Sequence, residues 1–123
     1  MKLETSRVTK LLKHDNDIER TVLHSLVHFP EAREDIKKLA EEDFYLLDNK
    51  DLFILLRDFI GSGIKFDVHT VPDNIKTNKT YLAVFSSRSD ILKVLWKSYL
   101  KKLKDISAKR KLQQLVAMYC QKL

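Results

Sequence analysis

Strong chain breakers are nearly absent from this sequence, which contains only two glycines and two prolines among its 123 residues. A chain of antiparallel strands needs many tight turns, and glycine and proline supply most of them. Helices need far fewer. Apolar residues also recur at helical spacing along most of the sequence. We therefore expect an all-α fold, with a small helical bundle followed by a long C-terminal helix.

The same shortage of glycine excludes one route of nucleotide hydrolysis. Gly61 and Gly63 are the only glycines, and no Gly-Lys-Ser or Gly-Lys-Thr follows them. A P-loop needs a glycine-rich turn that cradles phosphate, so we expect no cofactor in this segment and no ATPase or unwinding activity of this chain alone. Cys120 is the single cysteine, which makes an internal disulfide impossible. The absence of an export signal or an apolar run long enough to span a membrane favours the cytoplasm, with no membrane partner.

Positive charge is concentrated at the C-terminal end of the chain. The net charge is +6, but residues 88–123 carry ten basic and two acidic residues, whereas residues 1–87 have a balance of −2. This asymmetry is typical of proteins that contact nucleic acid or an acidic partner. The candidate contacts are Lys93, Lys97, Lys101, Lys104, Lys109, Arg110 and Lys111. The alternative is that these lysines only solvate one face of a long helix.

The sequence divides into three segments: a flexible N-terminal arm over residues 1–15, a bundle core over 16–88 and a long basic helix over 89–123. Asn16 and Glu19 are spaced as in a capping box at the start of the first helix. Pro30 predicts the start of a second helix with its inner face at Ala32, Ile36, Leu39 and Ala40. Asp48 predicts the start of a third, central helix, which Gly61 and Gly63 end. Asp67 predicts the start of a short helix, which Pro72 limits to about one turn. The polar residues 73–80 predict a loop. A short helix that packs on the core is then expected at Tyr81, Leu82 and Phe85.

The long C-terminal helix has an apolar seam in alternate steps of four and three residues, as in a coiled coil. The seam consists of Leu92, Trp96, Tyr99, Leu103 and Ile106. It stops near Ser107–Lys111, where we expect a bend or a change of partner, and resumes in a shifted register at Leu112, Val116, Tyr119 and Leu123. A helix this long has more apolar surface than a small bundle can cover, so we predict that the seam is an interface with a second copy. The alternative is that it folds onto its own bundle.

Groups that could carry chemistry are few. His24 and His28 have the spacing of metal ligands on a helix, but no third ligand lies nearby, so we interpret them as a structural pair and predict no metal site. Glu41, Glu42 and Asp43 are consecutive, which favours solvated charge at a helix end over an acid pair. Cys120 is interpreted as a small, partly buried residue. No nucleophile, base and oxyanion donor come together, so we predict no catalytic residues.

The order of several short motifs resembles a known family. The series begins with Ile18-Glu19-Arg20-Thr21-Val22-Leu23, Phe29-Pro30-Glu31-Ala32 and Glu42-Asp43-Phe44-Tyr45. It continues with Leu52-Phe53, Gly61-Ser62-Gly63 and Phe66-Asp67, and ends with Tyr81-Leu82, Tyr99-Leu100 and Lys109-Arg110-Lys111-Leu112. Over residues 17–117 this order resembles the N-terminal domain of the hexameric replicative DNA helicases of bacteria, the DnaB family. His24 stands where that family usually has glycine, and Pro72 shortens a helix that is normally longer.

The resemblance implies a collar domain in DNA replication. Such domains pair through a helical hairpin, of which the helix over 89–123 would be one arm, and they form dimers that build the hexamer. The collar docks primase and helps to handle single-stranded DNA, and a helicase loader is a further candidate partner. ATP and Mg²⁺ belong to the motor of the full-length helicase. Two alternatives stay open: the helicase-binding domain of bacterial primase, which has a similar fold, and a basic helical module that binds nucleic acid.

Overall fold

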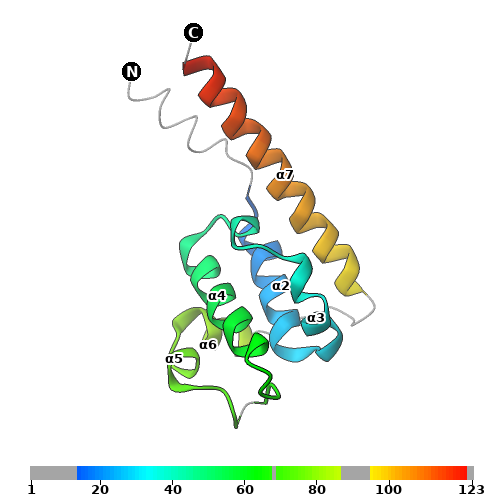
Figure 1. Cartoon of the computed structure of the whole chain (residues 1–123), viewed down its shortest axis with the longest axis vertical. Helices are drawn as coiled ribbons and strands as arrows, with labels where there is room; N and C mark the ends of the chain where they lie inside the picture. The colour runs from blue at the N-terminus through cyan, green and yellow to red at the C-terminus, as the bar shows by residue number, and fades with distance from the viewer. Residues whose placement is uncertain (1–13, 68, 87–94, 122–123) are drawn as a thin grey trace.

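The computed structural model describes residues 14–67, 69–86 and 95–121, and every regular element in these ranges is helical. This confirms the all-α prediction. A cluster of helices forms a bundle, and one long helix lies along it and projects beyond it (Figure 1). The elements are α2 (Asn16–His28), α3 (Pro30–Glu34), η1 (Ile36–Lys38), η2 (Glu41–Asp43), α4 (Leu47–Gly61), α5 (Asp73–Lys76), α6 (Lys79–Ser86) and α7 (Trp96–Gln121).

Helix α2 is the centre of the bundle, because it packs against α3, α4, α6 and α7. This corrects the prediction that the third helix, now α4, is central. In α4, Leu52, Phe53 and Leu56 are fully buried, whereas Leu55, Phe59 and Ile60 are only partly buried. One face of α4 therefore contacts the bundle and the other faces water.

The start of α2 differs from the predicted capping box. Asp15, not Asn16, is the N-cap, and its carboxylate accepts a hydrogen bond from the Ile18 N–H at 3.1 Å. The Glu19 side chain does not return to the helix start. It is buried, and it accepts hydrogen bonds from the backbone N–H groups of Tyr45 and Leu46 at 3.0 and 3.3 Å. Glu19 thus fixes the chain segment that leads into α4.

The core unites residues from all parts of the described chain. Aromatic stacking lies at its centre, where the rings of Phe44 and Phe53 are 4.8 Å apart. The buried apolar residues are Val22, Leu23, Leu26, Val27, Ala32, Ile36, Leu39, Phe44, Leu52, Phe53, Leu56, Val71, Ile75, Tyr81, Val84, Trp96, Leu100 and Leu103. Ala32, Ile36 and Leu39 point inward as predicted, although α3 ends at Glu34 and gives way to two short 3₁₀ turns.

The region from Phe66 to Ser86 contains more helix than predicted. The Asp67 carbonyl accepts from the N–H groups of Thr70 and Val71, which makes a turn and not a capped helix. Pro72 is then the N-cap of α5, so the predicted loop over 73–80 is wrong. Ile75 is buried and holds this short helix in place. In α6 Tyr81 is buried, but Leu82 is 52% exposed and does not pack on the core as predicted.

Helix α7 runs without interruption through 26 residues. The predicted change near Ser107–Lys111 is a change of surroundings, because Ser107 and Arg110 are its last buried residues. Beyond them the helix leaves the bundle (Figure 1). Residues 1–13 of the predicted arm, Leu92, Lys93 and Leu123 lie outside the described residues, whereas Asp15 at the end of that arm is the N-cap of α2.

Candidate interface on the C-terminal helix

The first half of α7 packs onto its own bundle. Trp96 and Leu103 are 2% and 1% exposed and belong to the core. Tyr99 and Ile106 are partly buried beside them. These residues of the predicted interface therefore pack against the bundle of their own chain, which was the alternative to an interface with a second copy. Little of Trp96 or Leu103 is left for a second copy to contact.

The buried stripe of α7 differs from the predicted seam at two positions, with Leu100 in place of Tyr99 and Ser107 in place of Ile106. It runs through Trp96, Leu100, Leu103, Ser107 and Arg110. Sequence reasoning missed Leu100, Ser107 and Arg110, since two of them are polar and interrupt an apolar pattern. Alternate steps of four and three residues, counted from Trp96, lead to all three of these residues, and this spacing is the one sequence signal that could have identified them as buried.

Two carboxylates anchor the first half of α7 to the bundle. The Trp96 indole N–H donates to the Asp35 carboxylate at 3.0 Å, and Lys38 also approaches Asp35, at 3.2 Å. Burial of Asp35 disfavours its ionised form, but the hydrogen bonds from Trp96 and Lys38 outweigh this effect and hold the pKa of Asp35 below its usual value. A charged carboxylate thus fixes the orientation of the indole.

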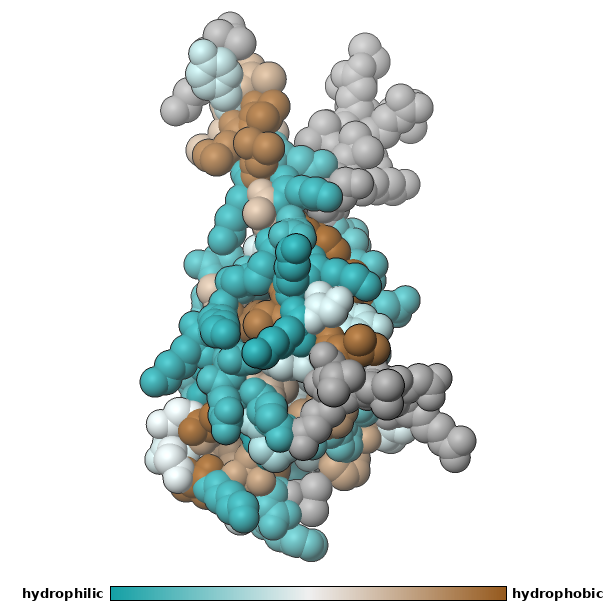
Figure 2. Space-filling model, turned by 90° about the vertical axis from the view of Figure 1, so that its right-hand side faces the viewer, coloured by the Kyte–Doolittle hydropathy of each residue, from teal (hydrophilic) through white to brown (hydrophobic). Residues whose placement is uncertain are grey.

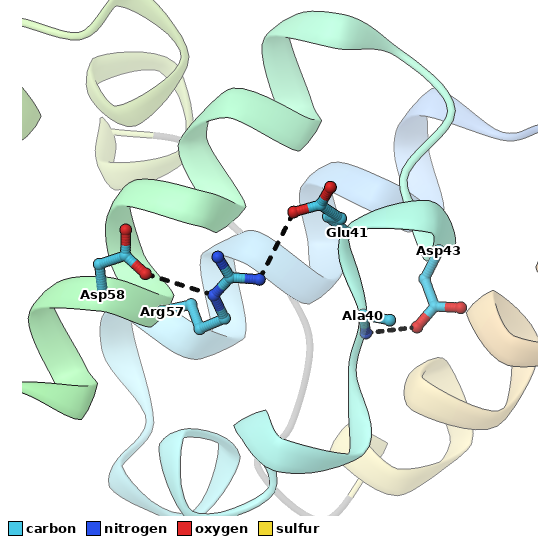
Figure 3. A network of polar contacts seen from close by, with 5 residues as sticks. All are labelled: Ala40, Glu41, Asp43, Arg57 and Asp58. Atoms are coloured by element: carbon cyan, nitrogen blue, oxygen red, sulfur yellow. Dashed lines mark hydrogen bonds and ion pairs between the residues drawn. The ribbon is translucent and has the colours of Figure 1, made fainter.

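Asp43 is the second anchor, and it corrects the prediction of solvated acidic charge at residues 41–43. Its side chain is 1% exposed. It accepts from the Ala40 N–H at 2.8 Å, and Figure 3 shows the carboxylate turned back to the start of its own 3₁₀ turn. Lys104 donates to the same carboxylate oxygen at 2.7 Å. Removal of either partner would leave the other without its main contact, and for Asp43 that loss occurs in the interior.

The neighbouring acid Glu41 behaves as predicted and stays exposed. It faces Arg57 of α4, whose guanidinium lies 3.6 Å from Glu41 and 3.4 Å from Asp58 (Figure 3). The three side chains are between 41% and 67% exposed. Such pairs contribute at most about 1 kcal/mol, so the cluster has little influence on the position of α7.

Arg110 holds α7 at the point where it leaves the bundle. Its guanidinium donates to the Glu42 carbonyl at 2.7 Å and lies over the ring of Tyr45, 5.4 Å from the ring centre. The residue is 4% exposed. Arg110 and Lys104 are therefore structural residues of this chain, whereas Lys97, Lys101, Lys109 and Lys111 are the predicted contacts that are exposed.

The second half of α7 carries an apolar surface that its own bundle does not cover. Its large residues are exposed, among them Leu115 at 62% and Tyr119 at 69%. No residue from 112 to 121 is charged. We call the set Leu112, Leu115, Val116 and Tyr119 the distal face. At roughly 3.6 residues per turn, the distal face lies on nearly the opposite side of α7 from the buried stripe. Figure 2 shows a brown apolar patch on the projecting end, above a mostly teal surface.

The paired histidines of α2 contact α6. His24 Nδ1 lies 2.7 Å from the Val84 carbonyl, and His28 Nε2 lies 3.2 Å from the Phe85 carbonyl. His24 thus bridges α2 and α6. Within the described ranges, no group of three or more potential ligands could hold a metal ion.

Cys120 is exposed, not partly buried as expected. None of the described helices is long and apolar enough to cross a membrane.

Comparison with known proteins identifies the family. A family model described as "DnaB-like helicase N terminal domain" matches residues 11–120. Searches of curated proteins and of solved structures found no match. The matched range includes every helix of the bundle and all but the last residue of α7. With its helical architecture, the match shows that this chain belongs to the family of DnaB-like helicase N-terminal domains.

Proposed function

We propose that this chain is the collar domain of a replicative helicase, which pairs with further copies through the distal face of α7 and docks primase in the cytoplasm. The observation that carries the pairing proposal is the uncharged, exposed distal face. Because it points away from its own bundle, a separate chain can reach it without displacing any core residue. Charged residues are depleted in the centres of protein interfaces, as they are here.

The size of the distal face predicts weak pairing. Full burial of one large apolar side chain is worth about 1.5–3 kcal/mol, and association costs at least about 4 kcal/mol. If pairing buries four such side chains of each copy in part, the free energy gained exceeds this cost only modestly. We therefore expect isolated domains to pair with a dissociation constant on the order of micromolar or weaker. In the full helicase, the attached motor domains would raise the local concentration and support the hexamer.

Sedimentation analysis of three proteins tests the pairing. The parent chain should self-associate as its concentration rises. Leu115→Glu should be monomeric with an unchanged circular dichroism spectrum, because it places a charge on each copy at the centre of the interface. Leu82→Glu is the matched control, since Leu82 is a similarly exposed leucine on α6. A parent that stays monomeric at high concentration, or a control that dissociates as much as Leu115→Glu, would contradict the proposal.

The family resemblance supports primase docking, and the exposed lysines of α7 offer a surface for it. Titration of the labelled chain with the primase of the same organism tests this part by fluorescence anisotropy. We expect saturable binding that is stronger for the paired chain than for Leu115→Glu. Saturable binding of single-stranded DNA with no binding of primase would favour the nucleic-acid module instead.

A further inference from the structure

A groove lies where α7 leaves the bundle, between α7, η2 and the start of α4. Its volume is about 470 Å³, which is within the range of ligand-binding pockets. Three cations line it: Lys50 from α4, and Arg110 and Lys111 from α7. The neighbouring Lys104 does not contribute free charge, because Asp43 pairs with it.

Among the described residues that line the groove, cations outnumber acids. Glu42 is the one acidic residue among those that line it. No carboxylate of the described residues forms an ion pair with Lys50 or Lys111. Arg110 is held rigidly by the Glu42 carbonyl and Tyr45, so the positive wall of the groove is preorganised. Anions are therefore attracted to this part of the chain.

The aromatic contacts oppose single-stranded nucleic acid as the occupant. Such ligands bind through bases stacked on exposed aromatic rings. Tyr45 is the partly exposed ring in the groove, but it is stacked on His14 at 4.6 Å and lies beneath Arg110. Both contacts occupy ring surface that a base would need. A run of phosphates would also lie close to the Glu42 carboxylate, which would repel it.

A peptide fits these groups better. Its acidic side chains can pair with Lys50 and Lys111, while its backbone N–H groups can donate to Glu42. Gln114 also lines the groove, and its side-chain amide can both donate and accept hydrogen bonds. We propose that the groove binds an acidic segment of a partner protein, with carboxylates at Lys50 and Lys111. The inference rests on the docking part of the proposed function and is independent of pairing through the distal face.

Fluorescence anisotropy with labelled hexaglutamate at low salt tests the inference. The parent chain should bind the peptide, and the double variant Lys50→Gln/Lys111→Gln should bind it at least about tenfold more weakly, as expected when charge-assisted hydrogen bonds are lost. The matched control is Lys76→Gln/Lys97→Gln, which removes the same charge from exposed lysines that do not line the groove. Its affinity should stay within about twofold of the parent.

Three results would overturn the inference. The first is that the parent does not bind the peptide. The second is an equal loss in the control double variant, which would mean that net charge and not the groove attracts the peptide. The third is tighter binding of short oligothymidylate than of hexaglutamate, with the same dependence on Lys50 and Lys111. Leu115→Glu should retain full peptide binding, so that failure of pairing and failure of the groove are distinguishable.

Discussion

The His28 side chain makes the contact between α2 and α6 dependent on pH. A carbonyl only accepts hydrogen bonds, so His24 carries a proton on Nδ1 and His28 on Nε2. The two rings are 4.3 Å apart. Burial, and next the nearby His24, lower the pKa of His28 below its usual value of 6.5, and they outweigh its bond to Phe85. The folded state thus favours the neutral ring.

We expect acidification to weaken the fold through His28. Its pKa is lower in the folded than in the unfolded chain, so the unfolded chain binds more protons as the pH falls below about 6.5. Its contribution to stability is present above that pH and is lost as the pH falls toward the folded-state pKa. His28 is well exposed, so the change is below about 1 kcal/mol. Urea unfolding between about pH 8 and pH 5 measures it.

Substitution of His28 isolates this effect. His28→Gln keeps a donor for the Phe85 carbonyl and should flatten the dependence of stability on pH. His69→Gln serves as the control, because His69 is exposed and lies in the turn before α5. An unchanged slope in His28→Gln would show that other groups cause the pH dependence.

At the scale of the element, α4 depends on one aromatic side chain. Phe53 is fully buried and stacks on Phe44. Phe53→Ala should lower the free energy of unfolding by about 3–5 kcal/mol, because it leaves a cavity that the surrounding helices cannot fill. Phe59→Ala on the same helix is the comparison. Phe59 is only partly buried, so its loss should be clearly smaller in chemical denaturation. Equal losses would mean that the two faces of α4 do not differ as described.

Apolar spacing in the sequence was sufficient to predict the helices that bury large side chains. The inner residues of α2 follow from it, as do Leu52, Phe53 and Leu56 of α4 and Trp96 and Leu103 of α7. It failed where polar groups enter the interior. Glu19, Asp43 and Arg110 are almost fully buried, yet a pattern that counts polar residues as exposed places them outside. Their partners are backbone groups or side chains far along the chain, such as Tyr45 for Glu19 and Lys104 for Asp43, so local spacing contains no sign of them.

The candidate interface shows the same limit. The excess of apolar surface on α7 was evident from its sequence, and the shift in register near Ser107 marked where the bundle ends. Which half of the stripe the bundle covers depends on its size and on the Asp35 and Asp43 anchors, which only the folded structure shows. The distal residues Leu112, Val116 and Tyr119 were recognised as a resumed seam, but not as the exposed part.

At the scale of the whole molecule, the chain combines a self-sufficient bundle with a helix that extends from it. All buried residues of α7 lie between Trp96 and Arg110. Every large apolar residue from 112 to 119 is exposed. Stability and association are therefore located in different parts of one helix, and a mutation can change one without the other. Leu103→Glu should unfold the bundle, whereas Leu115→Glu should not.

Truncation after Lys111 separates the two parts completely. The shortened chain keeps Arg110 and its contact with the Glu42 carbonyl, so its free energy of unfolding should stay within about 1 kcal/mol of the parent. It loses the distal face, so it should stay monomeric at concentrations where the parent pairs. Thermal unfolding followed by Trp96 fluorescence and sedimentation analysis measure the two properties. An unfolded truncated chain would show that residues after Lys111 stabilise the bundle. Because no part of the distal face remains in the truncated chain, pairing that persists in it would place the interface elsewhere.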